Sequence, residues 1–452
     1  MEVDEVSRMF VIANEKTKKP IKVWLPDETY IEETCLQQAY NLANLPFIHQ
    51  WVALMPDTHA GMGMPIGGVI ATENVVIPNA VGVDIGCGMA FVSTNIKVSD
   101  ISDVQTGNGS LIQGIIADIL RNIPTGFNRH KKVQSCETLD KAKKEMEKYS
   151  DNPELCKQIE AGYYQVGSLG GGNHFIELQE DDEGYLGIMV HSGSRNFGKQ
   201  VCDYFHHKAR ELNRKWRSEV PEEWRLAFLP CDIPEGQQYI RWMNLALDFA
   251  AENRAKMLDV VCEIVEKWIG KHTDFEVRYV SVHKEMENKV LQATTPEGLQ
   301  VELLKDLSIA NREGAILNCH HNYAALEHHY GKNVWVHRKG ATRAAKIDLA
   351  VIPGAMGSYS YVVRGLGNEM SFFSSSHGAG RLYSRKGAMA KFSTEEVMVD
   401  LQEQGVVLGK HNKKDVAEES RFAYKNIEEV MEFQKDLVLP VKRLKTIGVV
   451  KG

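Results

Sequence analysis

The chain has 452 residues, of which 43% are hydrophobic and 25% are charged, and its formal net charge is −7. This composition is typical of a globular protein, and no run approaches the roughly 20 apolar residues of a membrane span. The acidic N-terminus lacks the features of a secretion signal. Eight cysteines without a CxxC pair indicate reduced thiols and not a disulfide framework. We therefore expect a cytoplasmic protein with no membrane partner, and the net charge argues against non-specific binding of polyanions.

Apolar spacing and turn residues predict the following elements in chain order. Residues 1–30 are expected to form a hairpin or two edge strands, and further strands are expected at 48–56, 165–169, 175–178, 187–190, 277–282 and 334–337. Helices are expected at 31–44, 110–122, 135–162, 199–217, 237–270, 311–330, 394–404 and 426–436, before a short basic tail. Because strands and helices do not alternate regularly, the pattern predicts an α+β fold. We expect a single large domain over 1–452 with a mostly antiparallel or mixed central sheet flanked by helices.

A glycine-rich segment at 81–89, VGVDIGCGM, is the densest local signal in the chain. Its glycines flank the carboxylate of Asp84 and the thiol of Cys87, where the backbone must turn tightly or be approached closely. A hard oxygen ligand and a soft sulfur ligand three residues apart are typical of a site for divalent cations. The alternative is a buried bend in which Cys87 is a small apolar filler.

Four histidines occur in similar surroundings, three of them beside glycine or serine where a predicted strand ends. They are His174, His191, His321 and His377. The first three, with Asp84 and Cys87, offer more ligands than one tetrahedral ion needs, so two neighbouring metals could share the thiolate. Thiolate and imidazole favour zinc, while manganese and iron remain open. Five further histidines are expected at the surface or just outside the shell of metal ligands: His59, His206, His207, His328 and His329.

Phosphate binding is indicated by charge and glycine turns, without any P-loop or Rossmann fingerprint. Residues 337–392 carry nine Lys/Arg against two acids, a net +7 that predicts a basic surface for a phosphate-bearing substrate. The glycine turns at 170–172 and 378–380 could bind phosphate through backbone N–H groups, aided by Arg195 and Arg381.

Seven motifs in order resemble those of the RtcB-type RNA-splicing ligases, across essentially the whole chain: VGVDIGCGM, GGGNHF-I-E, HSGSR, HHNY, PGAMGS, SHGAGR and the terminal Lys-Gly. The resemblance implies an RtcB-like fold and a GTP- and Mn²⁺-dependent RNA ligase. Such an enzyme joins RNA ending in a 2′,3′-cyclic phosphate or 3′-phosphate to RNA with a 5′-hydroxyl, through a histidine–GMP intermediate. It serves in tRNA splicing or RNA repair.

The same resemblance implies roles for individual residues. The catalytic nucleophile is His377, and two Mn²⁺ ions are bound by Asp84, Cys87, His174, His191 and His321. The nucleotide is bound by Asn173, Glu177, Ser358, His377, Ala379, Gly380, Tyr424 and Lys451. RNA or phosphate is bound by Arg195, Arg381 and Asn322. A carboxylate such as Glu177 can accept from two adjacent N–H groups of guanine, which would favour GTP over ATP.

Two other functions use part of this constellation. A metal-dependent phosphoesterase acting on cyclic phosphate ends would need the metal ligands but neither His377 nor Glu177. A non-catalytic protein that binds RNA ends or nucleotides could keep the fold alone. The sequence leaves open the RNA substrate, an accessory activating protein, and the choice between monomer and homodimer.

Overall fold

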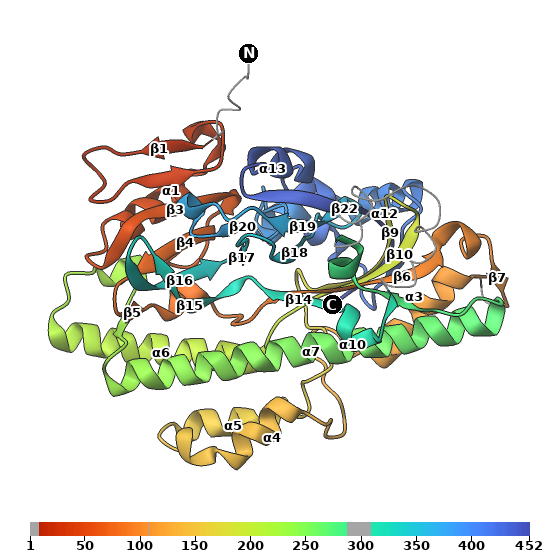
Figure 1. Cartoon of the computed structure of the whole chain (residues 1–452), viewed down its shortest axis with the longest axis horizontal. Coiled ribbons are helices and arrows are strands. Elements are labelled where there is room, and N and C mark those ends of the chain that lie inside the picture. The colour runs from red at the N-terminus through yellow and green to blue at the C-terminus, as the bar shows by residue number, and fades with distance from the viewer. Residues whose placement is uncertain (1–8, 108, 287–308) are drawn as a thin grey trace, which may run out of the picture.

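The computed structural model describes residues 9–107, 109–286 and 309–452 (Figure 1). The part of the predicted N-terminal hairpin before residue 9 lies outside these ranges. The described strands form two large mixed sheets and three small two-stranded ones, and the α+β prediction is confirmed. None of the described helices has the length and apolar composition that crossing a bilayer requires.

The larger sheet has ten strands and carries most of the site. Its main path runs β13 (Ile309–Ala310), β12 (Tyr279–Val280), β6 (Gly88–Lys97), β10 (Tyr185–Ser192), β9 (Phe175–Asp181), β22 (Val438–Lys451), β19 (Tyr359–Gly365) and β18 (Leu349–Ile352). Two further strands join it, β14 (Leu317–His320) beside β6 and β21 (Val407–Gly409) beside β22. All of these pairings are antiparallel except that of β21 with β22.

The second large sheet has six strands. In spatial order they are β1 (Phe10–Ile12), β2 (Ile21–Val23), β3 (Ile48–His59), β4 (Ile66–Thr72), β16 (Lys332–Lys339) and β15 (Asn322–His329). The small sheets pair β5 (Val75–Val76) with β11 (Leu229–Pro230), β17 (Ala341–Arg343) with β20 (Ser374–Ser376), and β7 (Gln105–Thr106) with β8 (Gly109–Ser110).

The described helices flank these sheets. They are α1 (Glu33–Ala43), α2 (Pro78–Val81), α3 (Leu111–Asn122), α4 (Glu137–Lys144), α5 (Pro153–Gly162), α6 (Arg195–Trp216), α7 (Pro234–His272), α10 (Arg312–Ala315), α11 (Arg385–Lys391), α12 (Thr394–Glu403) and α13 (Ile427–Phe433). Figure 1 shows α7 spanning the molecule with α6 alongside, and α4 with α5 on the outer side of that pair.

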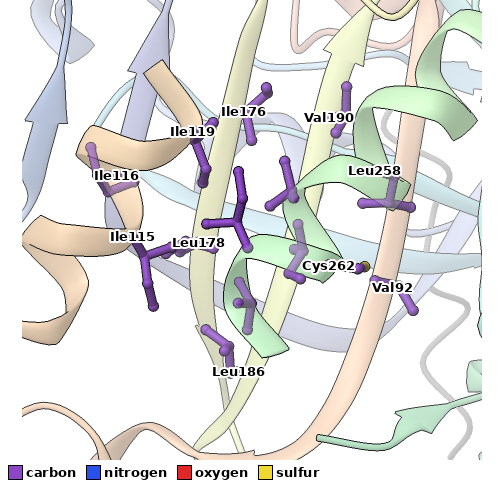
Figure 2. Close-up of a cluster of buried hydrophobic side chains, with 14 of the residues drawn as sticks. Val92, Ile115, Ile116, Ile119, Ile176, Leu178, Leu186, Val190, Leu258 and Cys262 are labelled. Atoms are coloured by element: carbon purple, nitrogen blue, oxygen red, sulfur yellow. The ribbon is translucent and has the colours of Figure 1, made fainter. Parts of the chain in front are cut away.

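The core beneath the large sheet explains why α3 and α7 form where they do. Helix α3 begins with a capping box. The Ser110 side chain accepts from the backbone N–H of Gln113, and the Gln113 side chain accepts from the backbone N–H of Ser110, so both N–H groups at the helix start are satisfied. The apolar residues of α3 recur at helical spacing, and Figure 2 shows Ile115 and Ile119 among the side chains of β9 and β10. Leu258 of α7 belongs to the same cluster (Figure 2). Helix α7 thus covers the sheet at which the site is built.

The helices predicted at 31–44, 110–122, 199–217, 237–270, 394–404 and 426–436 correspond to α1, α3, α6, α7, α12 and α13, with ends shifted by a few residues. The continuous helix predicted for 135–162 is wrong, because it breaks into α4 and α5 around Asn152. Pro153 restricts the preceding residue to non-helical backbone, and the Asn152 side chain accepts a hydrogen bond from Trp242 at 3.0 Å.

The helix predicted for 311–330 is also wrong. After the short helix α10, this segment forms β14 and β15. Tyr330 and Gly331 both have positive φ, at 48° and 80°, as a two-residue hairpin turn requires. They therefore join β15 to β16, with His329 paired to Lys332.

Two further predictions need correction. Residues 165–169 form a turn and not a strand, because Asn253 Oδ1 accepts from the backbone N–H groups of Gly167 and Ser168. The expected basic tail is part of β22, which runs to Lys451.

Candidate active site

The glycine-rich segment turns sharply between α2 and β6. Gly82 and Gly86 have φ of 100° and 77°, values that favour glycine. The backbone N–H of Cys87 donates to the carbonyl of Asp84 at 3.0 Å, which closes the turn. The turn directs the Asp84 carboxylate and the Cys87 thiol toward the same end of the large sheet.

Strand register brings the histidines to that end. His191 of β10 pairs with Phe175 of β9 on one side and with Met89 of β6 on the other. His320 of β14 pairs with Gly88. Since His174 precedes β9, Cys87 precedes β6 and His321 follows β14, these side chains meet at one sheet end although they are far apart in sequence.

The five predicted metal ligands form two groups of three that share Cys87. They are Asp84, Cys87 and His174, and Cys87, His191 and His321, with all ligand atoms of a group within 4.8 Å of one another. Cys87 Sγ lies 3.5 Å from His174 Nε2 and 3.3 Å from His191 Nε2. Nε2 of His191 lies 3.4 Å from Nε2 of His321, and Asp84 Oδ2 lies 3.0 Å from His174 Nε2.

The second nitrogen of two of these imidazoles is held by backbone. His174 Nδ1 lies 3.0 Å from the carbonyl of Leu169, and His191 Nδ1 lies 3.1 Å from that of Asn173. Because a carbonyl can only accept, each Nδ1 donates to it, and in a neutral ring this leaves the lone pair of Nε2 available for a metal, as in metal-binding histidines. The buried Nδ1 of His321 has no hydrogen-bond partner among the described residues.

The electrostatics also fit a cation. Burial lowers the pKa of His191 and of His321 well below its usual value, so both rings are neutral. Burial alone would raise the pKa of Asp84, but the contact with His174 brings it below its usual value. Burial and then Asp84 raise the pKa of the Cys87 thiol, so a bound dication would drive its proton off. One carboxylate, one thiol and three imidazoles therefore suit divalent ions.

His377 lies beside this cluster and follows β20. Its Nδ1 lies 2.7 Å from Asp57 Oδ2, and its backbone N–H donates to the same oxygen at 3.1 Å. Its ring centroid is 4.7 Å from that of His321. No described residue hydrogen-bonds to Nε2 of His377, whose ring lines a cavity of about 470 Å³. This volume lies in the range of ligand sites, about 300–1,000 Å³.

Most of the residues predicted for the site line this cavity. They are Asp84, Cys87, Asn173, His174, Glu177, His191, His321, Asn322, His377, Ala379, Gly380, Arg381, Tyr424 and Lys451. Ser358 and Arg195 do not line it. Arg195 Nη2 instead donates to the carbonyl of Gly126 at 2.8 Å, and its Nε donates to Ser168 at 3.0 Å.

Two buried glutamate side chains in the cavity wall differ in pKa. Burial raises the pKa of Glu177 to about 7, and its Oε2 accepts from Gln179 at 2.7 Å and from Thr446 at 3.1 Å. Burial of Glu419 is outweighed by Lys451 and Arg381, which keep its pKa below the usual value. Arg381 Nη2 lies 3.2 Å from Glu419 Oε1, so this arginine already has an anionic partner.

Two residues at the site were not anticipated from the sequence: Glu419, which lines the cavity, and the buried Asp57, which contacts His377. Lys339 and Arg385 also line the cavity and were anticipated only as members of the basic segment 337–392. Asp57 follows a predicted strand in PDTHAG, a pattern that hints at a site, whereas Glu419 has no motif around it. His59, which was expected at the surface or outside the metal-binding shell, also lines the cavity, and burial lowers its pKa to about 4.

The basic segment 337–392 does not form one continuous surface. Arg338 is fully buried and pairs with Glu327. Lys339 is buried and donates to the carbonyls of Met62 at 2.6 Å and Asn79 at 2.9 Å. Arg338 and Lys339 therefore do not contribute to the basic surface that was predicted to attract the substrate.

Comparison with known proteins agrees with the motif order. A family model described as "tRNA-splicing ligase RtcB" matches residues 38–298 and 288–452. The chain is 32% identical to the RNA-splicing ligase RtcB of Escherichia coli K12, over 96% of this chain and 97% of that protein. It is 31% identical to the tRNA-splicing ligase RtcB of Methanococcus maripaludis, over 93% of this chain and 92% of that protein. The chain therefore belongs to the RtcB family.

Proposed function

We propose that this protein is a GTP- and Mn²⁺-dependent RNA ligase. It joins RNA 2′,3′-cyclic phosphate or 3′-phosphate ends to 5′-hydroxyl ends through a histidine–GMP intermediate, in tRNA splicing or RNA repair. Family membership and the names of its relatives support RNA ligation. The observation that carries the proposal is that His377 and the five metal-ligand candidates line one cavity, with the rings of His377 and His321 4.7 Å apart.

The tautomer of His377 supports its role as nucleophile. Because Nδ1 donates to the Asp57 carboxylate, the lone pair of the neutral ring lies on Nε2, as a nucleophilic imidazole requires. In the proposed first step Nε2 attacks the α-phosphorus of GTP. A P–N bond forms, the P–O bond to the leaving group breaks, and pyrophosphate departs.

The next two steps transfer the activated phosphate to RNA. An oxygen of the RNA 3′-phosphate attacks the phosphorus of the histidine–GMP, so the P–N bond breaks and His377 is regenerated. The 5′-hydroxyl oxygen of the second RNA then attacks the 3′-phosphorus, GMP leaves, and the hydroxyl proton is lost to a base. A cyclic end is first hydrolysed to the 3′-phosphate at the same site.

Metal and nucleotide contacts follow from the cavity wall. Two Mn²⁺ ions held by Asp84, Cys87, His174, His191 and His321 would supply charge neutralisation for the triphosphate and pyrophosphate. Asn173, Ala379 and Gly380 would contact nucleotide phosphates, and Glu177, Tyr424 and Lys451 would contact guanine. Ser358, Asn322, Arg195 and Arg381 keep their predicted nucleotide or RNA roles as part of this proposal.

Incubation of the purified protein with α-³²P-GTP and MnCl₂, followed by a denaturing gel, tests the first step. We expect acid-labile label on the wild type and none on His377→Ala. RNA with a 3′-phosphate and RNA with a 5′-hydroxyl should then be joined only when GTP is present.

Other outcomes identify the alternatives. Opening of an RNA cyclic phosphate without GTP, and without labelled protein, would favour a metal-dependent phosphoesterase. Binding of RNA ends without any turnover would favour a non-catalytic role. An accessory activating protein would be indicated if label appeared only after a cell extract was added. We also propose a cytoplasmic location and one domain over 1–452, as monomer or homodimer.

A further inference from the structure

The loop between α3 and α4, residues 123–136, carries cations and an exposed aromatic residue beside the glycine-rich turn that precedes His174. It contains Arg129, Lys131 and Lys132 but no aspartate or glutamate, in a chain whose net charge is −7. All three cations are exposed. Their charge is therefore not neutralised within the loop, and polyanions would be attracted to it.

Backbone contacts fasten this loop to the glycine-rich turn before His174. Gly126 N–H donates to the carbonyl of Gly170 at 2.8 Å, and the carbonyl of Pro124 accepts from Leu169 N–H at 2.9 Å. Arg195 Nη2 donates to the carbonyl of Gly126 at 2.8 Å. The loop is thus positioned by the same turn that orients a metal-ligand candidate.

The turn also links the loop to the cavity. Gly171 lines the cavity, and a Cβ built on it would lie 3.5 Å from the Cα of Gly126. On the other side, a Cβ on Gly172 would meet the guanidinium of Arg385, which lines the cavity with a half-exposed side chain. The turn therefore has the loop on one side and the cation of Arg385, which lines the cavity, on the other.

Phe127 is the residue that gives the loop a specific chemistry. Its side chain is fully exposed, at 108% of the reference area. It lies at the tip of a turn in which Asn128 N–H donates to the carbonyl of Thr125 at 3.1 Å and Gly126 has a φ of 61°. One exposed aromatic residue alone needs no explanation. An aromatic ring on an anchored turn, followed by three cations, matches the stacking platforms that bind single-stranded nucleic acid.

We propose that single-stranded RNA leaving the cavity crosses the 123–136 loop, with one base stacked on Phe127 and backbone phosphates bound by Arg129, Lys131 and Lys132. This inference rests on the proposed function, because RNA must be the substrate. Stacking accepts any base, which suits an enzyme that must join ends of different sequence. In addition to the RNA role proposed above, Arg195 is a positioning residue that holds the loop through the carbonyl of Gly126.

The test compares full-length wild type with Phe127→Ala and Phe127→Trp. Phe275→Ala is the matched control, because Phe275 is also exposed but lies outside the loop. Binding is measured by fluorescence anisotropy with a labelled short single-stranded RNA that ends in a 3′-phosphate, and with a blunt duplex that carries the same end. GMP labelling of the wild type is measured in parallel and tests the proposed function without RNA.

Phe127→Ala should raise the Kd for single-stranded RNA about tenfold, since one stacked base is lost. Phe127→Trp should restore binding, while Phe275→Ala should bind as the wild type does. The blunt duplex should bind equally to all variants, because it has no unpaired base to stack. If Phe127→Ala binds single-stranded RNA as tightly as the wild type, the inference is overturned, whatever the labelling shows. Loss of wild-type labelling would instead overturn the proposed function.

A second variant tests the cations independently of Phe127. Replacing Arg129, Lys131 and Lys132 together with glutamine should reduce the slope of log K against log salt by about 2 for single-stranded RNA, since each phosphate contact contributes about 0.7. An unchanged slope would show that these side chains do not contact RNA phosphates.

Discussion

One oxygen of Asp57 accepts two hydrogen bonds from His377, at 2.7 Å from the ring Nδ1 and at 3.1 Å from the backbone N–H. The two residues are 320 positions apart, and the Asp57 side chain is completely buried. The pairing requires β3 to lie very close to Gly380. A glycine is needed there, because a Cβ at position 380 would overlap the carbonyl of Asp57. The pairing fixes both the ring orientation and the tautomer of the proposed nucleophile.

Asp57→Asn should slow guanylylation of His377. An amide in place of the carboxylate no longer enforces the tautomer with a lone pair on Nε2, and it cannot stabilise positive charge on the ring. We expect the initial rate of GMP labelling to fall by about 10²–10⁴-fold, with GTP binding largely retained. The labelling rate and the GTP affinity are measured on the same preparation.

The exposed Asp103→Asn is the matched control for this change, because it removes the same charge away from the cavity. It should label at the wild-type rate. Labelling of Asp57→Asn at the wild-type rate, in a protein with an unchanged melting temperature, would show that the Asp57–His377 contact is not needed.

Cys87→Ser should weaken metal binding at two positions, because Cys87 is the one residue common to both ligand groups. His321→Ala should weaken only one, since His321 belongs to one group. Replacing a residue that only hydrogen-bonds to a metal ligand typically lowers metal affinity about 10–100-fold. We expect replacement of a ligand itself to lower the affinity by at least this factor. Equilibrium dialysis against Mn²⁺ with elemental analysis gives the stoichiometry. Cys156→Ser, on α5 and outside both groups, should bind as the wild type does. Equal losses for Cys87→Ser and His321→Ala would contradict the shared thiolate.

The helices of this fold were predictable where local signals agree. Helix α3 has an apolar repeat and a capping box, so its position does not depend on distant contacts. The segment 311–330 was not predictable from such signals. Its strands exist because β14 pairs with β6 and β15 pairs with β16, and the turn uses Tyr330 where Asn or Asp is the usual signal. Pairing partners decided the structure there.

The same distinction applies to the site. Asp84 and Cys87 stand out because glycines flank them on a turn, and the structure places both beside the predicted histidines. Asp57 lies at the end of a long strand, and its partner is known only once β3 and β20 are side by side. Glu419 lies in a short 3₁₀ turn and acquires its cationic partners from β22 and from the segment before α11. Such partners depend on tertiary contacts that no local pattern encodes.

Glu327→Gln should destabilise the protein although it lies in no predicted site. The Arg338 guanidinium is fully buried and donates to both oxygens of Glu327, and also to the carbonyl of Phe372 at 2.8 Å. Removing the carboxylate charge leaves a buried cation unbalanced, which costs about 3–5 kcal/mol. Urea unfolding measures the loss, and the double variant Glu327→Gln/Arg338→Met should recover most of it.

The exposed pair Arg443–Glu428 provides the control for this prediction. Glu428→Gln should change stability by less than about 1 kcal/mol. If Glu327→Gln were as stable as the wild type, the buried Arg338 would not need the carboxylate charge of Glu327, and this prediction would be wrong.

Glu177 should make stability depend on pH. Its pKa is raised by burial from 4.5 to about 7 in the folded protein, so between these values the folded state holds a proton that the unfolded state has lost. The contribution of Glu177 to stability is therefore greatest below about pH 4.5, falls as the pH rises through this window, and levels off above about pH 7. The full loss is about 3–4 kcal/mol, because raising the pKa from 4.5 to about 7 is worth about 1.4 kcal/mol per pH unit.

Glu177→Gln removes this titration and keeps an oxygen that can accept from Thr446 and Gln179. The free energy of unfolding of the variant, relative to the wild type, should therefore rise between about pH 4.5 and pH 7. Urea unfolding at a series of pH values measures the difference. A constant difference for Glu177→Gln across this range would mean that Glu177 is ionised throughout. If the ionised carboxylate accepts the two N–H groups of guanine, guanine binding should strengthen as the pH rises through about 7. A carboxylate that is ionised throughout would show no such increase in affinity.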